Sequence, residues 1–404
     1  MAQHEFKYVI IGGGLAGTSA IKGIRQLDKN GSILMLAGER HRPYDRPPLT
    51  KQLWFGKKEV REIFLGSPDY FNEQGVDLKL GVLAASLNPE RKTVIDNNGQ
   101  SYAYEKLLLA TGAVPRMLDV PGGAATSLNA GVCYYRYLDD YEHVRSTVLP
   151  GVTVVVIGGG FIGSEIAAAL CANKANVTMV FPENYLCSRI FPHELGKAMQ
   201  KRYIKSGINI LNEDVPVMFE EENDRYITYT RSGKKLESSL VIVGVGTIPS
   251  VELAQAAGLQ VGNGIIVDKY LCTSNGDIFA AGDNAYFPHH VFGEQMRIEH
   301  WDNARKQGKL AGRNMAGAGE LYDHMPYFFS DLFEFGYEAV GMIDSRLEIQ
   351  CDWEKPNEIG FVYYTVDNII RGVMMCNVWG KVDWARDLIR RGERLAVPEL
   401  RKAV

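Results

Sequence analysis

The cysteines of this 404-residue chain show no pairing pattern. They are Cys133, Cys171, Cys187, Cys272, Cys351 and Cys376. No two of them form a CxxC or CxxxxC pair, and no group of cysteines and histidines has the spacing of a zinc or iron–sulfur site. We therefore expect buried, reduced thiols in a cytosolic protein and no redox disulfide. Electron transfer by this chain would need an organic cofactor.

The chain also lacks a strong net charge, a long apolar run and low-complexity segments. Its net charge of −4 argues against nucleic acid or a membrane surface as its main partner. No apolar stretch approaches the roughly 20 residues that span a bilayer. Because the first apolar run begins at Tyr8, we expect no signal or transit peptide and a cytoplasmic location. The length predicts a globular protein of two or three domains.

Two glycine-rich motifs follow apolar runs and predict dinucleotide binding. The first comprises Gly12, Gly13, Gly14, Leu15, Ala16 and Gly17 after residues 8–11, and the second comprises Gly158, Gly159, Gly160, Phe161, Ile162 and Gly163 after residues 154–157. In such motifs the first glycine permits a tight turn, the second lets the backbone approach a pyrophosphate, and the third allows close helix packing. The phosphates lie at the N-terminus of the following helix. Two such motifs predict two dinucleotides bound at once.

An acidic residue follows each motif at the offset that suits a ribose hydroxyl. Glu39 comes after the apolar residues 33–36, and Glu183 comes after residues 177–180. Ordinary glycine-rich turns are the alternative interpretation of either motif alone. Strand, motif and acid agree twice, which favours a dinucleotide pair.

The pattern behind each motif indicates an internal duplication. Strand-like runs follow at residues 76–80, 92–95 and 106–112 in the first half, and at 208–211, 225–229 and 240–246 in the second. A turn signal, Asn98-Gly99 or Ser232-Gly233, separates the last two runs in each half. Each half therefore predicts a βαβ unit, a small antiparallel meander and a closing strand.

Residues 277–283 form a further apolar strand that ends in Gly-Asp without a third motif. We expect it to return to the first sheet, so that the second dinucleotide-binding domain is inserted in the first. A helix over residues 301–315 carries small residues at helical spacing, which indicates close packing or close approach to a ligand. After residue 325, aromatic and β-branched runs predict an antiparallel sheet, with an amphipathic helix near residues 382–391.

The chain resembles the ferredoxin-reductase and apoptosis-inducing-factor branch of two-dinucleotide-binding flavoproteins over nearly its whole length. The marks are both motifs, residues 42–51 (RPYDRPPLTK), 110–112 (ATG), 163–165 (GSE), 245–249 (VGTIP), 281–283 (AGD) and 299–304 (EHWDNA). The resemblance implies a glutathione-reductase-like α/β fold of two Rossmann-like domains and a C-terminal α+β domain. The implied boundaries are 1–117 and 248–324 for the FAD domain, 118–247 for the NAD(H) domain and 325–404 for the C-terminal domain.

The resemblance also assigns cofactor contacts by position. It places FAD at the first motif with Glu39, and NADH at the second with Glu183 on the adenine ribose and Gly246 near the nicotinamide. The other implied FAD contacts are Arg46, Lys51, Thr111, Gly112, Arg116, Asp283, His300, Trp301 and Phe329. A carboxylate at Glu183 repels the 2′-phosphate of NADPH, so NADH is favoured. Arg189 is the residue that would accommodate that phosphate.

Lys51 and Glu165 are the implied catalytic residues. In the family this pair meets beside the flavin N5, where it orients the nicotinamide and stabilises the reduced flavin. A structural ion pair at a domain seam is the alternative interpretation. Relatives that use a thiol against the flavin carry a cysteine early in the first domain, whereas the first cysteine here is Cys133.

One departure from the family lies in the C-terminal domain. Many members have Trp before Ser-Asp where this chain has Phe329-Ser330-Asp331. Phenylalanine keeps an apolar cover but loses an N–H donor. Access of a partner or a quinone could differ as a result.

The sequence and the resemblance together predict an NADH-dependent FAD oxidoreductase that passes electrons to a ferredoxin or rubredoxin. Two alternatives stay open: an NADH-responsive flavoprotein with slow turnover and redox-linked dimerisation, and a quinone or dioxygen reductase. A homodimer is possible. The last 24 residues hold seven Lys or Arg against four Asp or Glu. That excess could dock an acidic redox protein, although a solvated helix face is the favoured interpretation.

Overall fold

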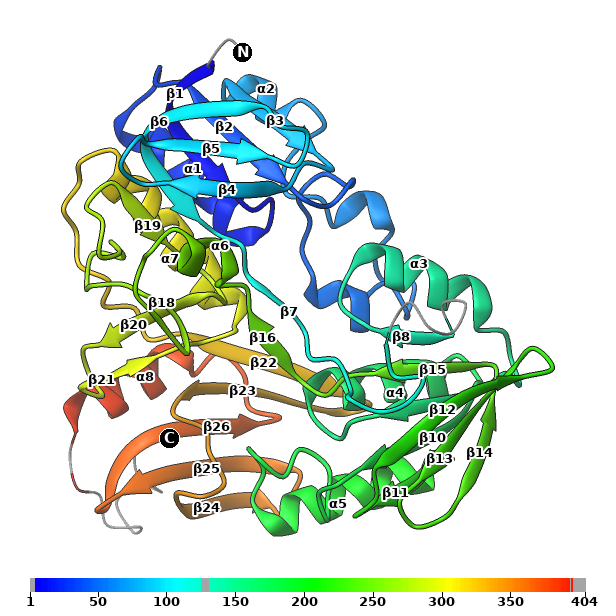
Figure 1. Cartoon of the computed structure of the whole chain (residues 1–404). Helices are drawn as coiled ribbons and strands as arrows, with labels where there is room; N and C mark the ends of the chain where they lie inside the picture. Colours follow the sequence, from blue (N-terminus) through cyan, green and yellow to red (C-terminus); the bar gives the residue numbers. More distant parts are fainter. Residues whose placement is uncertain (1–3, 125–130, 393, 395–404) are drawn as a thin grey trace. The chain divides into compact units, whose positions relative to one another are not determined.

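The structure is a computed structural model that describes residues 4–124, 131–392 and 394 (Figure 1). Residues 1–3, and residues 393 and 395–404 of the basic C-terminal run, lie outside the described residues. The chain divides into two compact units. The first comprises Met1–Asp45, Val60–Val114 and Ile248–Pro326, and the second comprises Arg46–Glu59, Pro115–Thr247 and Tyr327–Val404. No helix among the described residues is long and apolar enough to cross a membrane.

A seven-stranded sheet forms the core of the first unit. Its order is β3 (Val76–Leu80), β2 (Ile33–Ala37), β1 (His4–Ile11), β6 (Ser101–Leu109), β5 (Thr93–Asp96) and β4 (Ala84–Asn88), with β19 (Ile278–Ala280) also paired to β6. The strand pairs β1–β2, β2–β3, β1–β6 and β6–β19 are parallel. The pairs β4–β5 and β5–β6 are antiparallel and form a meander. Val9, Leu34 and Leu108 are fully buried, as expected for parallel strands covered on both faces.

Strand β19 confirms that residues 277–283 return to the first sheet. Ile278 pairs with Leu107 and Ala280 with Leu109 in parallel register. On the same side of β6, the first half of that strand pairs with β5, from Ser101 to Ala103. The chain between β6 and β19 is therefore an insertion between two neighbouring strands of the first sheet. Residues 115–247 of this insertion belong to the second unit.

Helices α1 (Leu15–Leu27) and α7 (Trp301–Met315) pack against each other at backbone distance. A Cβ on Gly308 would lie 2.1 Å from the Ala16 carbonyl oxygen, and one on Gly312 would lie 2.1 Å from the Ala20 carbonyl oxygen. Both distances are impossible for a real side chain, so these positions require glycine. The small face of the predicted helix 301–315 therefore serves helix packing in the first unit.

Short elements complete the first unit. They are η2 (Val60–Glu62), α2 (Tyr70–Glu73), α6 (Glu252–Ala256), and a four-stranded sheet of β17 (Val261–Gly262), β18 (Gly264–Ile266), β20 (Ala285–His289) and β21 (Glu294–Met296). Strands β7 (Ala113–Pro115) and β16 (Thr247–Pro249) pair in a two-stranded sheet where the chain passes between the units.

The second unit repeats the parallel sheet. Its order is β11 (Asn209–Asn212), β10 (Asn176–Phe181), β9 (Thr153–Ile157), β15 (Leu240–Val243) and β8 (Val132–Tyr134), all parallel. Its remaining helices before the C-terminal region are η1 (Pro47–Thr50), α3 (Leu138–Thr147), α4 (Phe161–Ala172) and α5 (His193–Lys205). The meander β12 (Pro216–Glu222), β13 (Arg225–Thr230) and β14 (Lys235–Ser238) forms a separate sheet here, whereas in the first unit it shares β6.

An antiparallel sheet fills the C-terminal region, as predicted. Its order is β22 (Tyr327–Leu332), β23 (Phe335–Gly341), β26 (Ile369–Cys376), β25 (Ile359–Val366) and β24 (Glu348–Lys355). Helix α8 (Val382–Arg391) buries Ala385, Leu388 and Ile389 and contacts β23 and β26 (Figure 1). Strand β24 was not predicted, because it is a largely exposed edge strand with charged residues along it.

Replacing Gly312 with alanine should destabilise the first unit. The new Cβ would collide with the Ala20 backbone, so α7 must move away from α1, at a cost of about 1–3 kcal/mol. Denaturant unfolding of Gly312→Ala measures this cost. Gly276→Ala is the matched control, since a Cβ there meets nothing within 4 Å. Equal stability of the two variants would contradict the packing argument.

Candidate functional site

The first glycine motif has the geometry of a phosphate-binding turn. Gly12 has φ +121°, and a Cβ on it would lie 2.0 Å from the Ala110 carbonyl oxygen at the end of β6. A Cβ on Gly17 would lie 2.1 Å from the Gly12 carbonyl oxygen. A Cβ on Gly14, by contrast, would meet nothing within 4 Å. The first and third glycines are thus needed for packing, and the second leaves its backbone open at the start of α1.

The second motif repeats this geometry. Gly158 has φ +114°, and a Cβ on it would lie 2.3 Å from the Gly244 carbonyl oxygen beyond β15. A Cβ on Gly163 would lie 2.1 Å from the Gly158 carbonyl oxygen, while one on Gly160 meets nothing within 4 Å. Leu15 and Ala16 begin α1, and Phe161 and Ile162 begin α4. Both turns therefore present an open backbone and a helix N-terminus, which fits a pyrophosphate.

The two acidic residues lie just beyond the second strand of each sheet. Glu39 follows β2 and accepts a hydrogen bond from the Tyr44 hydroxyl at 2.5 Å. Glu183 follows β10 and is partly buried, and its backbone carbonyl accepts from the Glu213 N–H. Arg189 is exposed, and its backbone carbonyl accepts from the Ser345 N–H. Both carboxylates thus occupy the place in the strand order that suits a ribose.

Polar groups at the carboxyl ends of β6 and β19 fit a polar cofactor in the first unit. The Thr111 hydroxyl donates to the Ser250 carbonyl at 2.7 Å and accepts from Asn284 Nδ2 at 2.9 Å. Asn284 is fully buried, and its Oδ1 has no hydrogen-bond partner within the described part of the chain. Asp283 precedes it and is partly buried. A buried acceptor without a partner is costly, so a ligand donor there would satisfy it.

A second orphaned group lies near the first turn of α1. Gln307 is fully buried on α7, and its Oε1 accepts from the Gly282 N–H at 2.9 Å. Its Nε2 has no partner among the described residues. A Cβ on Gly282 would lie 3.1 Å from the Ala16 Cβ, so this group borders the phosphate-binding helix. Neither Asn284 nor Gln307 was predicted as a site residue, although Asn284 directly follows the predicted strand 277–283 and Gln307 lies within the predicted helix 301–315.

His300 and Trp301 begin α7 in the first unit. Trp301 Nε1 donates to Asp45 Oδ1 at 2.7 Å, which ties the helix to the segment around residues 42–45. Burial lowers the pKa of the His300 imidazole to about 4, although Glu299 and Asp302 act in the opposite direction. His300 is therefore neutral near pH 7 and offers one donor and one acceptor nitrogen.

Other predicted contacts lie where the chain passes between the units. Gly112 has φ +67°, and its carbonyl oxygen accepts a hydrogen bond from the Ser250 N–H. In the second unit, the Arg116 N–H donates to the Gly246 carbonyl at 2.9 Å, and Gly246 is exposed with φ +98°. The Arg46 guanidinium donates to the Arg136 carbonyl and lies 5.2 Å from the Tyr137 ring.

The second unit brings Lys51 and Glu165 together. Lys51 Nζ lies 3.0 Å from Glu165 Oε1, and only 8% and 10% of the two side chains are exposed. Lys51 caps the C-terminus of η1, whereas Glu165 lies near the N-terminus of α4. A buried ion pair of this kind holds its charges only while both partners stay in place.

Two hydroxyl groups that the sequence reasoning missed complete the ion pair. The Thr50 hydroxyl donates to Glu165 Oε2 and the Ser330 hydroxyl to Glu165 Oε1, both at 2.5 Å. Thr50 lies in the 42–51 segment, which is a mark of the resemblance, whereas Ser330 lies in the Phe-Ser-Asp segment, where the chain departs from the family. Nothing in the local sequence says which carboxylate either hydroxyl meets.

Phe329 packs against the same lysine. Lys51 Nζ lies 3.3 Å from the Phe329 carbonyl oxygen and 4.5 Å from the centre of its ring. Phe161 of the second motif is 39% exposed and meets Phe328 edge-on at 5.4 Å. Aromatic groups of β22 therefore flank both the ion pair and the start of α4.

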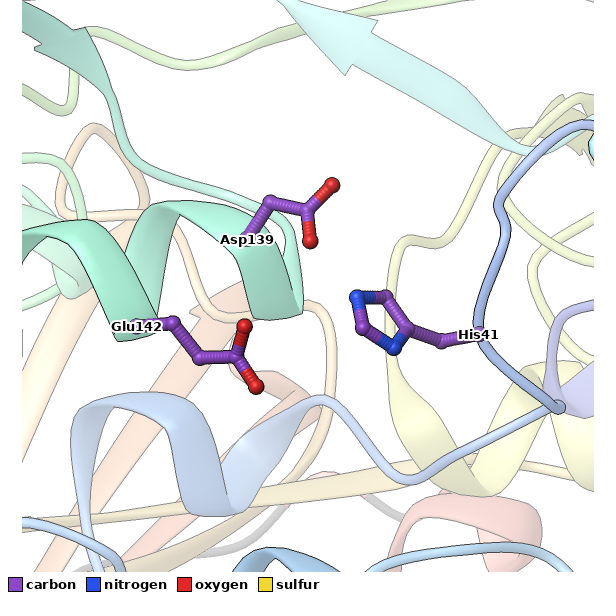
Figure 2. A group of neighbouring side chains, drawn as sticks. All are labelled: His41, Asp139 and Glu142. Carbon is purple, nitrogen blue, oxygen red and sulfur yellow. The ribbon is translucent and has the colours of Figure 1, made fainter.

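Figure 2 shows His41, Asp139 and Glu142, which we do not assign as a metal site. Asp139 and Glu142 lie three residues apart on α3 of the second unit, and both are exposed. His41 belongs to the first unit. Exposed carboxylates on one helix face are common without a metal.

The six cysteines are free thiols. Burial raises the pKa of Cys187 to about 12 and raises those of Cys133 and Cys376 well above the usual range. Because only a thiolate attacks or is readily oxidised, these buried thiols are inert near neutral pH.

Comparison with known proteins agrees with this arrangement. A family model described as pyridine nucleotide-disulphide oxidoreductase matches residues 6–308. A second model, described as the C-terminal part of mitochondrion-associated apoptosis-inducing factor, matches residues 311–359.

Individual relatives match most of the chain. Mitochondrial apoptosis-inducing factor 1 of Dictyostelium discoideum is 34% identical over 95% of this chain and 78% of that protein. Monodehydroascorbate reductase of Pisum sativum is 33% identical over 84% of this chain and 82% of that protein. The crystal structure of a covalent putidaredoxin reductase–putidaredoxin complex is similar with a TM-score of 0.92 and 30% identity, over 98% of this chain and 95% of that one.

Alkylation of the native protein should separate the thiols by burial. At about pH 8 we expect iodoacetamide to modify exposed Cys351 first and to leave Cys133, Cys187 and Cys376 unmodified, because these three side chains are buried out of reach of the reagent. Mass spectrometry of peptides measures the modification, and unfolding in urea should expose all six. Rapid native modification of Cys187 would contradict the inert-thiol interpretation.

Proposed function

We propose a function from the family of this chain, which belongs to the pyridine nucleotide-disulphide oxidoreductases. The chain is an FAD-dependent oxidoreductase that takes its electrons from NADH and passes them to a small redox protein. FAD, when bound, would supply the chemistry that connects NADH, a two-electron donor, to a one-electron acceptor.

The ion pair of Lys51 and Glu165 is the observation that carries the proposal. We assign both residues catalytic roles beside the flavin, with Lys51 presenting a fixed positive charge and Glu165 holding that charge in place. The pair is buried, so its field is little screened by water. Hydride transfer needs such alignment rather than a nucleophile.

We propose the following division of cofactor contacts. The proposed FAD contacts are the first motif and Glu39, Arg46, Lys51, Thr111, Gly112, Arg116, Asp283, His300, Trp301 and Phe329. NADH is held by the second motif with Glu183, Arg189 and Gly246. The open backbones at Gly14 and Gly160 and the unpartnered amide atoms of Asn284 and Gln307 support this division. The three-domain boundaries predicted from the sequence stay part of the proposal.

A small redox protein of the ferredoxin or rubredoxin class is the proposed acceptor. The similarity to putidaredoxin reductase in complex with putidaredoxin supports this choice. The absence of paired cysteines among the described residues supports direct electron transfer without a disulfide. Reduced thiols also support a cytoplasmic location.

A second candidate function is an NADH-responsive flavoprotein with slow turnover and redox-linked dimerisation. The match of residues 311–359 to the C-terminal part of apoptosis-inducing factor, and the similarity to the Dictyostelium protein, favour it. Reduction of a small molecule, such as a quinone or dioxygen, is a third candidate. The similarity to monodehydroascorbate reductase favours an acceptor of small size.

An anaerobic NADH titration of the purified protein should bleach the flavin absorbance bands. Addition of a ferredoxin or rubredoxin should then restore them rapidly, because electrons leave through the redox protein. A long-wavelength charge-transfer band that persists in the presence of redox proteins would instead support the NADH-responsive candidate. A purified protein without flavin would overturn the assignment of the first motif.

Replacing Glu183 with serine should relax the preference for NADH. Without the carboxylate the 2′-phosphate of NADPH is no longer repelled, so we expect kcat/KM with NADPH to rise about tenfold. A tenfold rise corresponds to about 1.4 kcal/mol of repulsion removed. Steady-state assays with both nucleotides measure the change. Arg189→Ala is the companion variant and should lower the residual use of NADPH. An unchanged nucleotide preference in Glu183→Ser would place the ribose contact elsewhere.

A further inference from the structure

The carboxylate of Glu165 accepts hydrogen bonds from donors on two chain segments remote from α4. Thr50 and Lys51 come from the end of η1, and Ser330 comes from β22 of the C-terminal sheet. Thr50 is 8% exposed, Ser330 1% and Glu165 9%. All the groups therefore meet away from water.

Each hydroxyl group gives its single proton to the carboxylate. Thr50 Oγ1 also lies 3.4 Å from the Pro47 carbonyl oxygen, but its contact with Glu165 Oε2 is 2.5 Å, so the shorter contact takes the proton. Ser330 donates to Oε1, the same oxygen that faces Lys51 Nζ. Because both oxygens are engaged, the carboxylate plane is fixed and one oxygen stays directed at the lysine.

Strand β22 acts on both members of the ion pair. Ser330 donates to Glu165, while the preceding residue, Phe329, offers its carbonyl oxygen and ring to the Lys51 ammonium group. The C-terminal sheet is thus part of the ion-pair site. The two hydroxyl donors and the Lys51 ammonium group together engage both oxygens of the buried carboxylate.

We propose that Thr50 and Ser330 are positioning residues for hydride transfer. Their hydroxyl groups orient the Glu165 carboxylate, which in turn holds the Lys51 ammonium group in one position. This inference rests on the proposed function, which places the ion pair beside the flavin. The residues act through Glu165 and have no role in binding NADH. Their effect should therefore appear in the flavin reduction potential and in the rate of reduction, while NADH affinity stays constant.

The test compares variants with and without the hydroxyl donors in the FAD-loaded protein. Thr50→Val keeps the branched shape and removes the donor, Thr50→Ser keeps the donor, and Ser330→Ala removes the second donor. Thr365→Val is the matched control, since Thr365 is a buried threonine of β25 whose hydroxyl donates to the Glu348 carbonyl. Redox-dye titration gives the potential, and stopped-flow reduction gives the rate constant and the Kd for NADH.

We expect Thr50→Val and Ser330→Ala each to slow flavin reduction about tenfold and to shift the potential to more negative values. The shift follows because a less ordered lysine stabilises the reduced flavin less. Thr50→Ser should rescue both quantities, and Thr365→Val should match the wild type. In a Glu165→Gln background, Thr50→Val should add nothing further, because the group it acts through is already changed.

Several outcomes would overturn the inference. Variants that unfold at lower temperature yet keep the wild-type potential and reduction rate would show a purely structural role. Effects that stay additive with Glu165→Gln would show that the hydroxyl groups do not act through the carboxylate. Ser330→Ala keeps the test decisive if Thr50→Val does not fold. A wild-type protein that holds no flavin, or whose flavin NADH does not reduce, overturns the proposed function instead.

Discussion

The second unit depends on keeping one buried negative charge compensated. Glu165 lies on the helix that follows the second glycine motif, and its donors come from η1 and β22. Moving a carboxylate out of water costs on the order of several kcal/mol unless charged or hydroxyl donors replace the water. These contacts link residues 46–59 and the C-terminal sheet to α4 within one compact unit, the unit that holds the second dinucleotide-binding sheet.

Backbone approach is the corresponding constraint in the dinucleotide-binding turns. In both turns the first glycine faces the carbonyl at the end of the neighbouring strand, and the third faces the carbonyl of the first. A Cβ on Gly12 or Gly158 would lie 2.0 or 2.3 Å from the first of these carbonyl oxygens, and a Cβ on Gly17 or Gly163 would lie 2.1 Å from the second. The two halves of the chain thus share their turn geometry, although the meander that follows is attached differently in each.

Features with a local signal could be predicted from the sequence. Buried strands, the Asn98-Gly99 turn and the helices α7 and α8 follow from apolar runs and periodicity. Helix α5 was missed although Leu195, Met199 and Tyr203 recur every fourth residue and are buried, so the signal was present. The Thr50 and Ser330 hydroxyls could not be assigned, because they meet Glu165 across 115 and 165 residues of sequence.

The late position of β19 and α7 along the chain has a consequence for synthesis on the ribosome. Until residues 278–280 emerge, the second half of β6 has no partner on one side, and until residues 301–315 emerge, the face of α1 at Ala16 and Ala20 stays uncovered. The first unit begins at the N-terminus, yet its core closes only after residues 115–247 of the other unit have been made. A nascent chain therefore exposes an open sheet edge from the synthesis of β6 until the synthesis of β19, the kind of surface that chaperones shield.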